Sequence, residues 1–254
     1  MLTGYERFRD TFAPYKDSFV VIGGTAIEML RGPNPRFPRT TKDIDMVVMT
    51  PSVNPEFAAR LSAFVKEGGY ECYFSGGRPH FYRFMRPKLA DYPYQLEMLT
   101  RSPLPENKDI HYVRISEKPD ESLSAMVMDS DYYDFVQRVA VEQDGFRRLS
   151  SLGLIVFKAH AYQNLMAEYE RTGDGVLKTS AAKHRRDVFL LVQESLPSER
   201  LELPQPIADR MRTFLAFFPP TSDLWPAILS SVRDLAGDPA SYRARFSSMF
   251  NLGV

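Results

Sequence analysis

Two aspartates, Asp43 and Asp45, occupy alternate positions at the start of the otherwise apolar run 43–49. Side chains alternate between faces along a β-strand, so this spacing places both carboxylates on one face, about 6–7 Å apart along the chain. Two carboxylates on one face repel each other unless a cation lies between them. Such oxygen ligands suit Mg²⁺, which is bound by one or two carboxylates together with the phosphates of a substrate. The pair therefore predicts a magnesium site for phosphate chemistry.

A Gly-Gly pair precedes the aspartates and predicts the phosphate site itself. Gly23 and Gly24 follow the apolar run 19–22, which reads as a buried strand, and precede residues 25–30, which read as the start of a helix. A glycine turn at this point exposes backbone N–H groups and the positive end of the helix dipole, which together favour an anion. Triphosphate, magnesium and paired carboxylates form one coherent set, that of metal-assisted phosphoryl or nucleotidyl transfer.

Each motif alone also has an ordinary structural explanation. A Gly-Gly pair after a strand is usually a tight turn, and a D-x-D pair is usually a solvated strand face. The combination is more specific, because the strand, glycine turn, helix, proline-rich loop and second strand follow in this order between residues 19 and 45. Since the strand with the aspartates is otherwise apolar, it looks buried on both faces, where carboxylates are costly without a metal or a cationic partner.

The pattern of expected strands and helices along the chain predicts an α+β protein. It has an N-terminal mixed sheet flanked by helices, which must position these residues, and a C-terminal helical domain. We place the catalytic domain at residues 1–145 and the helical domain at 146–254. In the first, helices are expected near 3–12 and 57–67 and further strands at 70–74, 80–85, 94–99 and 111–115. The stretch 129–149 suggests a short helix and a hairpin that turns at Asp144-Gly145. In the second, helical periodicity covers 154–170, 181–194, 206–218 and 223–235.

Composition narrows the classes of protein. The 254 residues include 32 Lys plus Arg and 32 Asp plus Glu, so the formal net charge is zero and a cationic nucleic-acid coat is excluded, although a local basic patch is not. The single cysteine, Cys72, cannot form an internal disulfide and fits a reducing compartment. We expect a cytoplasmic protein without a membrane segment, because the N-terminal residues contain no apolar signal core and no apolar run approaches the roughly 20 residues that span a bilayer.

These motifs resemble the nucleotidyltransferase fold of the DNA polymerase β superfamily. The resemblance is carried by Gly23-Gly24-Thr25-Ala26 followed by Arg39-x-Thr41-x-Asp43-x-Asp45. More narrowly, the chain resembles the AbiEii/AbiGii toxin-type nucleotidyltransferases of type IV toxin–antitoxin and phage-defence systems, because residues 157–162, which include Lys158, and Lys183-His184-x-x-Asp187 are similar to two family helices. The resemblance covers about residues 15–195. One departure is Thr25, where the superfamily commonly has serine.

The resemblance implies a role for each matching residue. Asp43 and Asp45 would hold Mg²⁺, and the superfamily places a third carboxylate on a neighbouring strand, for which Glu97 is the candidate. The substrate would be a nucleoside triphosphate, and the catalytic set would include Lys158 and Asp187. The residues expected at its phosphates are Gly23, Gly24, Thr25, Arg39, Thr41 and Lys42.

Three of these residues keep a second interpretation. Glu97 also has the ordinary interpretation of a solvated strand glutamate, and Lys158, in an apolar stretch, either extends to solvent or meets an anion. Asp187 lies four residues after Lys183, so a surface ion pair along one helix competes with a position beside Lys158.

The predicted activity is transfer of a nucleoside monophosphate to a hydroxyl of an RNA, such as a tRNA, or of a protein. An RNA acceptor and an antitoxin partner follow from the resemblance alone. The rival hypothesis is a nucleotide-binding module of the same fold that catalyses no transfer. The two differ in whether the third carboxylate completes the metal site.

Overall fold

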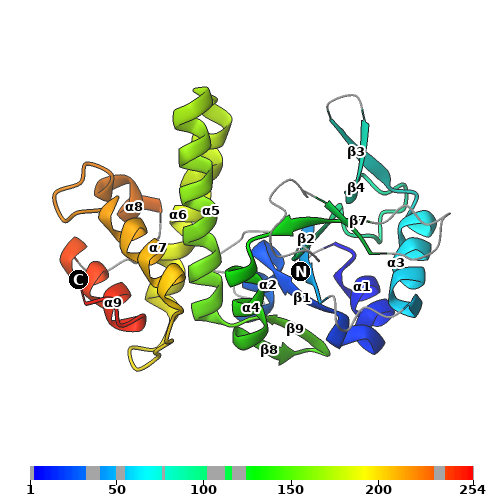
Figure 1. Ribbon diagram of the computed structural model, residues 1–254, viewed down its shortest axis with the longest axis horizontal. Coiled ribbons are helices and arrows are strands. Elements are labelled where there is room, and N and C mark those ends of the chain that lie inside the picture. Colours follow the sequence, from blue (N-terminus) through cyan, green and yellow to red (C-terminus); the bar gives the residue numbers. More distant parts are fainter. Residues whose placement is uncertain are drawn as a thin grey trace. The chain divides into compact units, whose positions relative to one another are not determined.

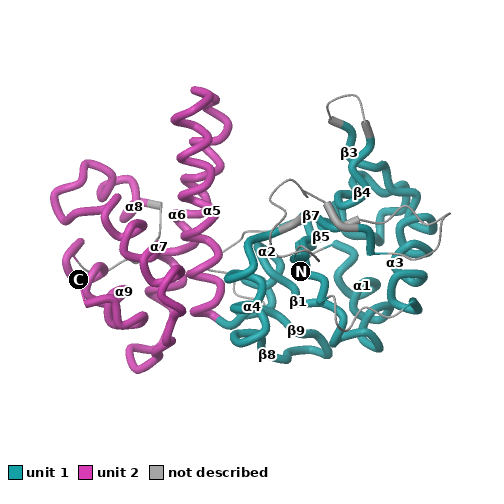
Figure 2. The backbone as a smooth tube through the Cα atoms, viewed as in Figure 1, with its two compact units in different colours: residues 1–150 teal, residues 151–254 magenta. Residues whose placement is uncertain are grey.

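The computed structural model of the chain describes residues 3–32, 41–49, 55–75, 78–101, 112–115, 124–231 and 238–253. The chain divides into two compact units, residues 1–150 and 151–254, which are coloured separately in Figure 2. Each unit has its own buried apolar core, and each is described below by itself.

In the described part of the chain, the first unit is built on a nine-stranded mixed sheet. The main strand order is β3-β4-β5-β2-β1-β9-β8, and β7 pairs with both β5 and β6. The strands are β1 (Phe19–Ile22), β2 (Asp43–Val48), β3 (Glu71–Ser75), β4 (Arg78–Met85), β5 (Gln95–Arg101), β6 (Tyr112–Arg114), β7 (Ser124–Met128), β8 (Ala140–Gln143) and β9 (Phe146–Leu149). The accompanying helices are α1 (Tyr5–Phe12), a 3₁₀ helix (Ala13–Ser18), α2 (Gly23–Arg31), α3 (Pro55–Gly68) and α4 (Ser130–Val139).

Helices cover both faces of the central strands (Figure 1). On one face, Phe19 of β1 packs against Phe8 and Phe12 of α1 and against Phe57 of α3, and all four rings are fully buried. Phe19 pairs with Val48, so the even-numbered residues of β2 share this face. Asp43 and Asp45 therefore lie on the opposite face, beside α2.

The second unit is helical and consists of α5 (Ser151–Thr172), α6 (Gly175–Glu194), α7 (Gln205–Ala216), α8 (Trp225–Ser231) and α9 (Pro239–Met249). Its core contains a cluster of aromatic rings centred on Phe189 of α6, which contacts Phe214, Phe218, Trp225 and Tyr242. This burial stabilises α6 along the half that follows Asp187.

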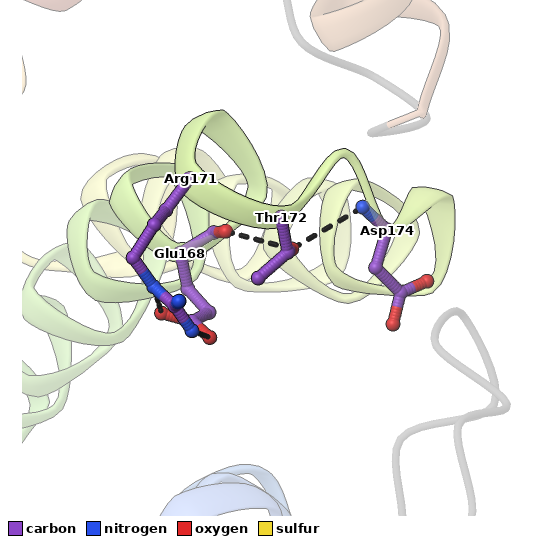
Figure 3. A network of polar contacts seen from close by, with 4 residues as sticks. All are labelled: Glu168, Arg171, Thr172 and Asp174. Atoms are coloured by element: carbon purple, nitrogen blue, oxygen red, sulfur yellow. Dashed lines mark hydrogen bonds and ion pairs between the residues drawn. The ribbon is translucent and has the colours of Figure 1, made fainter.

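A tight turn joins α5 to α6 (Figure 3). The Thr172 hydroxyl donates to the Glu168 carbonyl at 2.8 Å and accepts from the Asp174 amide at 3.3 Å. Asp174 then caps α6 by accepting from the Val176 amide at 2.9 Å. Arg171 also pairs with Glu168 through two hydrogen bonds, but both side chains are exposed, so that pair adds little stability. The capped turn sets which residues of the two helices face each other.

The α+β expectation is confirmed, and the expected hairpin is present: β8 and β9 turn at Asp144 and Gly145, which both have positive φ. Three of the described elements were not predicted: the 3₁₀ helix Ala13–Ser18, β7 and α9. The expected helix 223–235 is described only as α8, and residues 232–237 lie outside the described part of the chain. In the part that is described, no helix is long and apolar enough to cross a membrane.

Candidate active site

The glycine turn lies directly against an aspartate. Gly23, the first residue of α2, has φ of 67°, a left-handed conformation that glycine adopts without strain. A Cβ on Gly23 would come within 2.3 Å of Asp45 Oδ2, so the Asp45 carboxylate would have to move. Glycine is thus favoured here for two independent reasons, and the backbone at the start of α2 can approach the carboxylate closely.

The next residues tie α2 to the start of β2. A Cβ on Gly24 would come within 2.8 Å of Thr41 Oγ1, so a second close approach depends on glycine. The Thr25 hydroxyl is buried and donates to the Asp43 carbonyl at 2.5 Å. The Thr41 amide donates to the Glu28 carboxylate of α2. These contacts fix the position of the helix N-terminus relative to the two aspartates.

Strand register places a third acidic side chain in the same row. Asp45 of β2 is directly opposite Glu97 of the parallel strand β5. Glu97 is directly opposite Arg83 of the antiparallel strand β4. Residues opposite each other in neighbouring strands share a face, so Asp45, Glu97 and Arg83 form a row across three strands.

Arg83 holds Glu97 in a bidentate ion pair. Arg83 Nε donates to Glu97 Oε2 at 2.9 Å, and Nη2 donates to Oε1 at 3.0 Å. The guanidinium also lies over the Tyr73 ring, 4.8 Å from its centroid. The two charged side chains are 28 % and 14 % exposed, so this pair is partly shielded from water.

The pKa of Asp43 reflects the charged side chains of this row. Burial raises the pKa of the Asp43 carboxyl, and the negative charge of Glu97 raises it further, whereas Arg83 and Lys42 lower it. Burial and Glu97 therefore outweigh the two cations at Asp43, and a bound divalent cation would favour the ionised form of this carboxyl.

Asp43 and Asp45 suit a divalent cation by ligand chemistry and by their shared face. Among the described residues, however, no group of three or more Asp, Glu, His or Cys side chains is arranged to hold a metal ion. Glu97 is instead occupied by Arg83. The donor set that fits the ion is thus the aspartate pair.

A second polar pair lies in the helical unit. Lys158 Nζ of α5 is 3.0 Å from Asp187 Oδ2 of α6, and the side chains are only 7 % and 5 % exposed. Lys183, the alternative partner on the same helix, is exposed. The structure therefore favours the interpretation that places Asp187 beside Lys158.

A family model matches residues 8–249, nearly the whole chain, and describes the nucleotidyl transferase AbiEii toxin of type IV toxin–antitoxin systems. The chain belongs to the AbiEii family. No curated protein and no solved structure matches it significantly. The match agrees with the predicted family and supports a nucleotidyltransferase and a toxin.

Most of the predicted site residues of this AbiEii chain lie together in the first unit. One group lies where the start of α2 approaches the start of β2, and it consists of Gly23, Gly24, Thr25, Thr41, Lys42, Asp43 and Asp45. Glu97 lies beside Asp45 on the neighbouring strand. Arg39 lies outside the described residues. Lys158 and Asp187 lie in the second unit and pair with each other.

Sequence reasoning missed Arg83. An arginine in a strand is unremarkable without knowledge of its neighbours, and its partner Glu97 is fourteen positions away. The only available signal was that residues 80–85 and 94–99 both read as strands. The register that aligns Arg83 with Glu97 is decided by pairing in the sheet.

Proposed function

We propose that this chain transfers a nucleoside monophosphate from a nucleoside triphosphate to a hydroxyl of an RNA, with tRNA as the expected class, or of a protein. The observation that carries the proposal is the close approach of the Gly23 backbone to Asp45 at the start of α2. It brings a helix N-terminus, which favours phosphate, to a carboxylate pair, which favours a divalent cation.

Each residue has a defined part in this proposal. Backbone N–H groups at Gly23 and Gly24 bind phosphate oxygens, and Thr25 holds β2 in place through its hydrogen bond to the Asp43 carbonyl. Asp43 and Asp45 would hold Mg²⁺, which would neutralise charge on the reacting phosphate and favour ionisation of the acceptor hydroxyl. The positive charge of Lys42, beside Asp43, supplements the phosphate site together with Arg39.

Lys158 and Asp187 complete the proposed catalytic set. Desolvation offsets much of the attraction within this buried pair at 3.0 Å, so a gain in stability is a weak explanation for its presence. The resemblance to the family predicts that Lys158 contacts the nucleotide phosphates and that Asp187 orients Lys158 or accepts the proton of the attacking hydroxyl.

The test is incorporation of label from each of the four α-³²P nucleoside triphosphates into total RNA and total protein, with and without Mg²⁺. We expect Mg²⁺-dependent labelling by the wild type and none by Asp45→Asn. Asp10→Asn is the matched control, because Asp10 is exposed on α1 and is expected to leave labelling unchanged. Label that is independent of Asp45 would defeat the proposal.

One observation favours the alternative of a nucleotide-binding module without transfer, namely that Arg83 occupies the third carboxylate. In that case the wild type would bind a triphosphate with Mg²⁺ yet label neither RNA nor protein. The family also predicts an antitoxin partner, so expression of the wild type, but not of Asp45→Asn, should arrest growth of a host that lacks it.

A further inference from the structure

The cation Arg83 lies in the same row as the carboxylates of Asp45 and Glu97. The Asp43 carboxylate lies on the same face of the sheet. Adjacent strands are about 4.8 Å apart, so Arg83 is one strand beyond Glu97 and two strands beyond Asp45. Its guanidinium is nonetheless joined to the row, because both of its hydrogen bonds go to Glu97, the residue directly opposite Asp45. Arg83 is therefore one of the charged side chains at the site.

Glu97 is poorly placed to act as a metal ligand. Both of its oxygens accept hydrogen bonds from Arg83, and the Gln95 side chain donates to Oε2 at 3.4 Å. Bidentate arginine–carboxylate pairs are among the stronger polar contacts in proteins, and this one is partly shielded and stacked on Tyr73. Mg²⁺ needs only one or two carboxylates when substrate phosphates supply further oxygens. The site thus does not require Glu97 to leave Arg83.

Arg83 has capacity for a second anion. A guanidinium carries five N–H donors, and the two bonds to Glu97 use two of them. Its side chain is 28 % exposed, so solvent and ligands reach it. A planar, permanently charged group that is oriented by a carboxylate is well suited to bind phosphate.

Building on the function proposed above, we propose that Glu97 is a positioning residue that orients Arg83, and that Arg83 binds a phosphate group of the triphosphate. The metal is then held by Asp43 and Asp45 without Glu97. The chemical class that Arg83 recognises is a polyphosphate, whatever base the nucleotide carries.

The test measures metal and polyphosphate binding separately, without turnover. Mn²⁺ binding to the full chain is followed by electron paramagnetic resonance, and binding of inorganic tripolyphosphate in the presence of Mn²⁺ is followed by calorimetry. The variants are Glu97→Gln, Arg83→Gln and the double variant. Arg86→Gln is the matched control, because Arg86 follows the same strand and pairs with Glu71 at an exposed position.

We expect Glu97→Gln to leave Mn²⁺ affinity within about threefold of the wild type, because Glu97 does not contact the ion. Arg83→Gln should weaken tripolyphosphate binding about tenfold or more, as for loss of a hydrogen bond to a charged group. Glu97→Gln should weaken it several-fold, and the double variant should bind no more weakly than Arg83→Gln, since Glu97 acts through Arg83. Arg86→Gln should bind like the wild type.

Two outcomes would overturn the inference: loss of Mn²⁺ binding in Glu97→Gln as large as in Asp45→Asn, or unchanged tripolyphosphate binding in Arg83→Gln. If Arg83→Gln fails to fold, Arg83→Lys replaces it, because lysine keeps the charge but not the bidentate geometry. Arg83→Lys should weaken tripolyphosphate binding several-fold, and unchanged binding would count against the inference. Failure of the proposed function is distinguishable, because there Asp45→Asn itself would bind Mn²⁺ as the wild type does.

Discussion

The buried pair Lys158–Asp187 allows stability and function to be separated. Replacing Lys158 by methionine keeps most of the length of the side chain but removes its charge, so Asp187 stays buried without its cationic partner. At an effective dielectric constant of about 20, two unit charges 3.0 Å apart attract each other by about 5–6 kcal/mol. Desolvation offsets much of this attraction, and breaking such a pair typically costs about 3–5 kcal/mol. We expect Lys158→Met to lower the stability of the helical unit by that amount.

The assay is urea unfolding followed by the fluorescence of Trp225. It is the only tryptophan of the chain, is buried in the helical unit and contacts Phe189 of α6, the helix that carries Asp187. With a slope of about 1–3 kcal/mol per molar urea, the midpoint should fall by at least about 1 M. Lys183→Met, which removes an exposed charge four residues before Asp187, is the control and should shift the midpoint little.

The double variant Lys158→Met/Asp187→Leu removes both charges and should recover most of the lost stability, because an apolar pair avoids the desolvation penalty. It should nonetheless remain inactive in the labelling assay if the pair has the proposed catalytic role. The reasoning would be refuted if Lys158→Met cost less than about 1 kcal/mol, or if the double variant were as unstable as the single one.

Three further predictions concern the first unit. Gly23→Ala should abolish labelling and weaken Mn²⁺ binding, since its Cβ would displace the Asp45 carboxylate. Gly32→Ala has no described atom within 4 Å of its Cβ, so it should show only the backbone cost of about 1–3 kcal/mol for its φ of 59° and ψ of −162° in thermal unfolding, and it should remain active. Equal activity of the two variants would contradict this. Burial raises the pKa of Tyr70 above its usual value of about 10, so the folded state keeps this proton at a pH where the unfolded state loses it. The free energy of unfolding should therefore fall as pH rises above about 10. Tyr70→Phe should flatten that fall in urea titrations, and an unchanged pH dependence would exclude Tyr70 as its source. Burial raises the pKa of the Asp43 carboxyl, and the charge of Glu97 raises it further, so ionisation of Asp43 lowers the stability of the fold as pH rises above about 4. Asp43→Asn should therefore leave the metal-free melting temperature at pH 7 unchanged or higher. A clear drop would indicate a structural role for the carboxylate.

Local signals were sufficient to predict the glycine turn and the strand with the paired aspartates. The Gly-Gly turn and the D-x-D strand could be recognised because close backbone approach and strand alternation depend on residues a few positions apart. The same holds for the Asp144-Gly145 hairpin, which short-range turn chemistry specifies. Strand β7 and helix α9 were missed, because neither presents a periodic apolar pattern strong enough to identify it.

The amino-acid sequence by itself determined the family, the α+β class, and the glycine turn and paired aspartates at which phosphate chemistry is expected. Tertiary structure alone decided the partners of the remaining charges. Sheet register aligned Glu97 with Arg83, and the packing of α5 on α6 paired Asp187 with Lys158 rather than with Lys183. The physical reason is that a buried charge takes its partner from whichever element packs against it, and that choice depends on contacts between residues far apart in the chain.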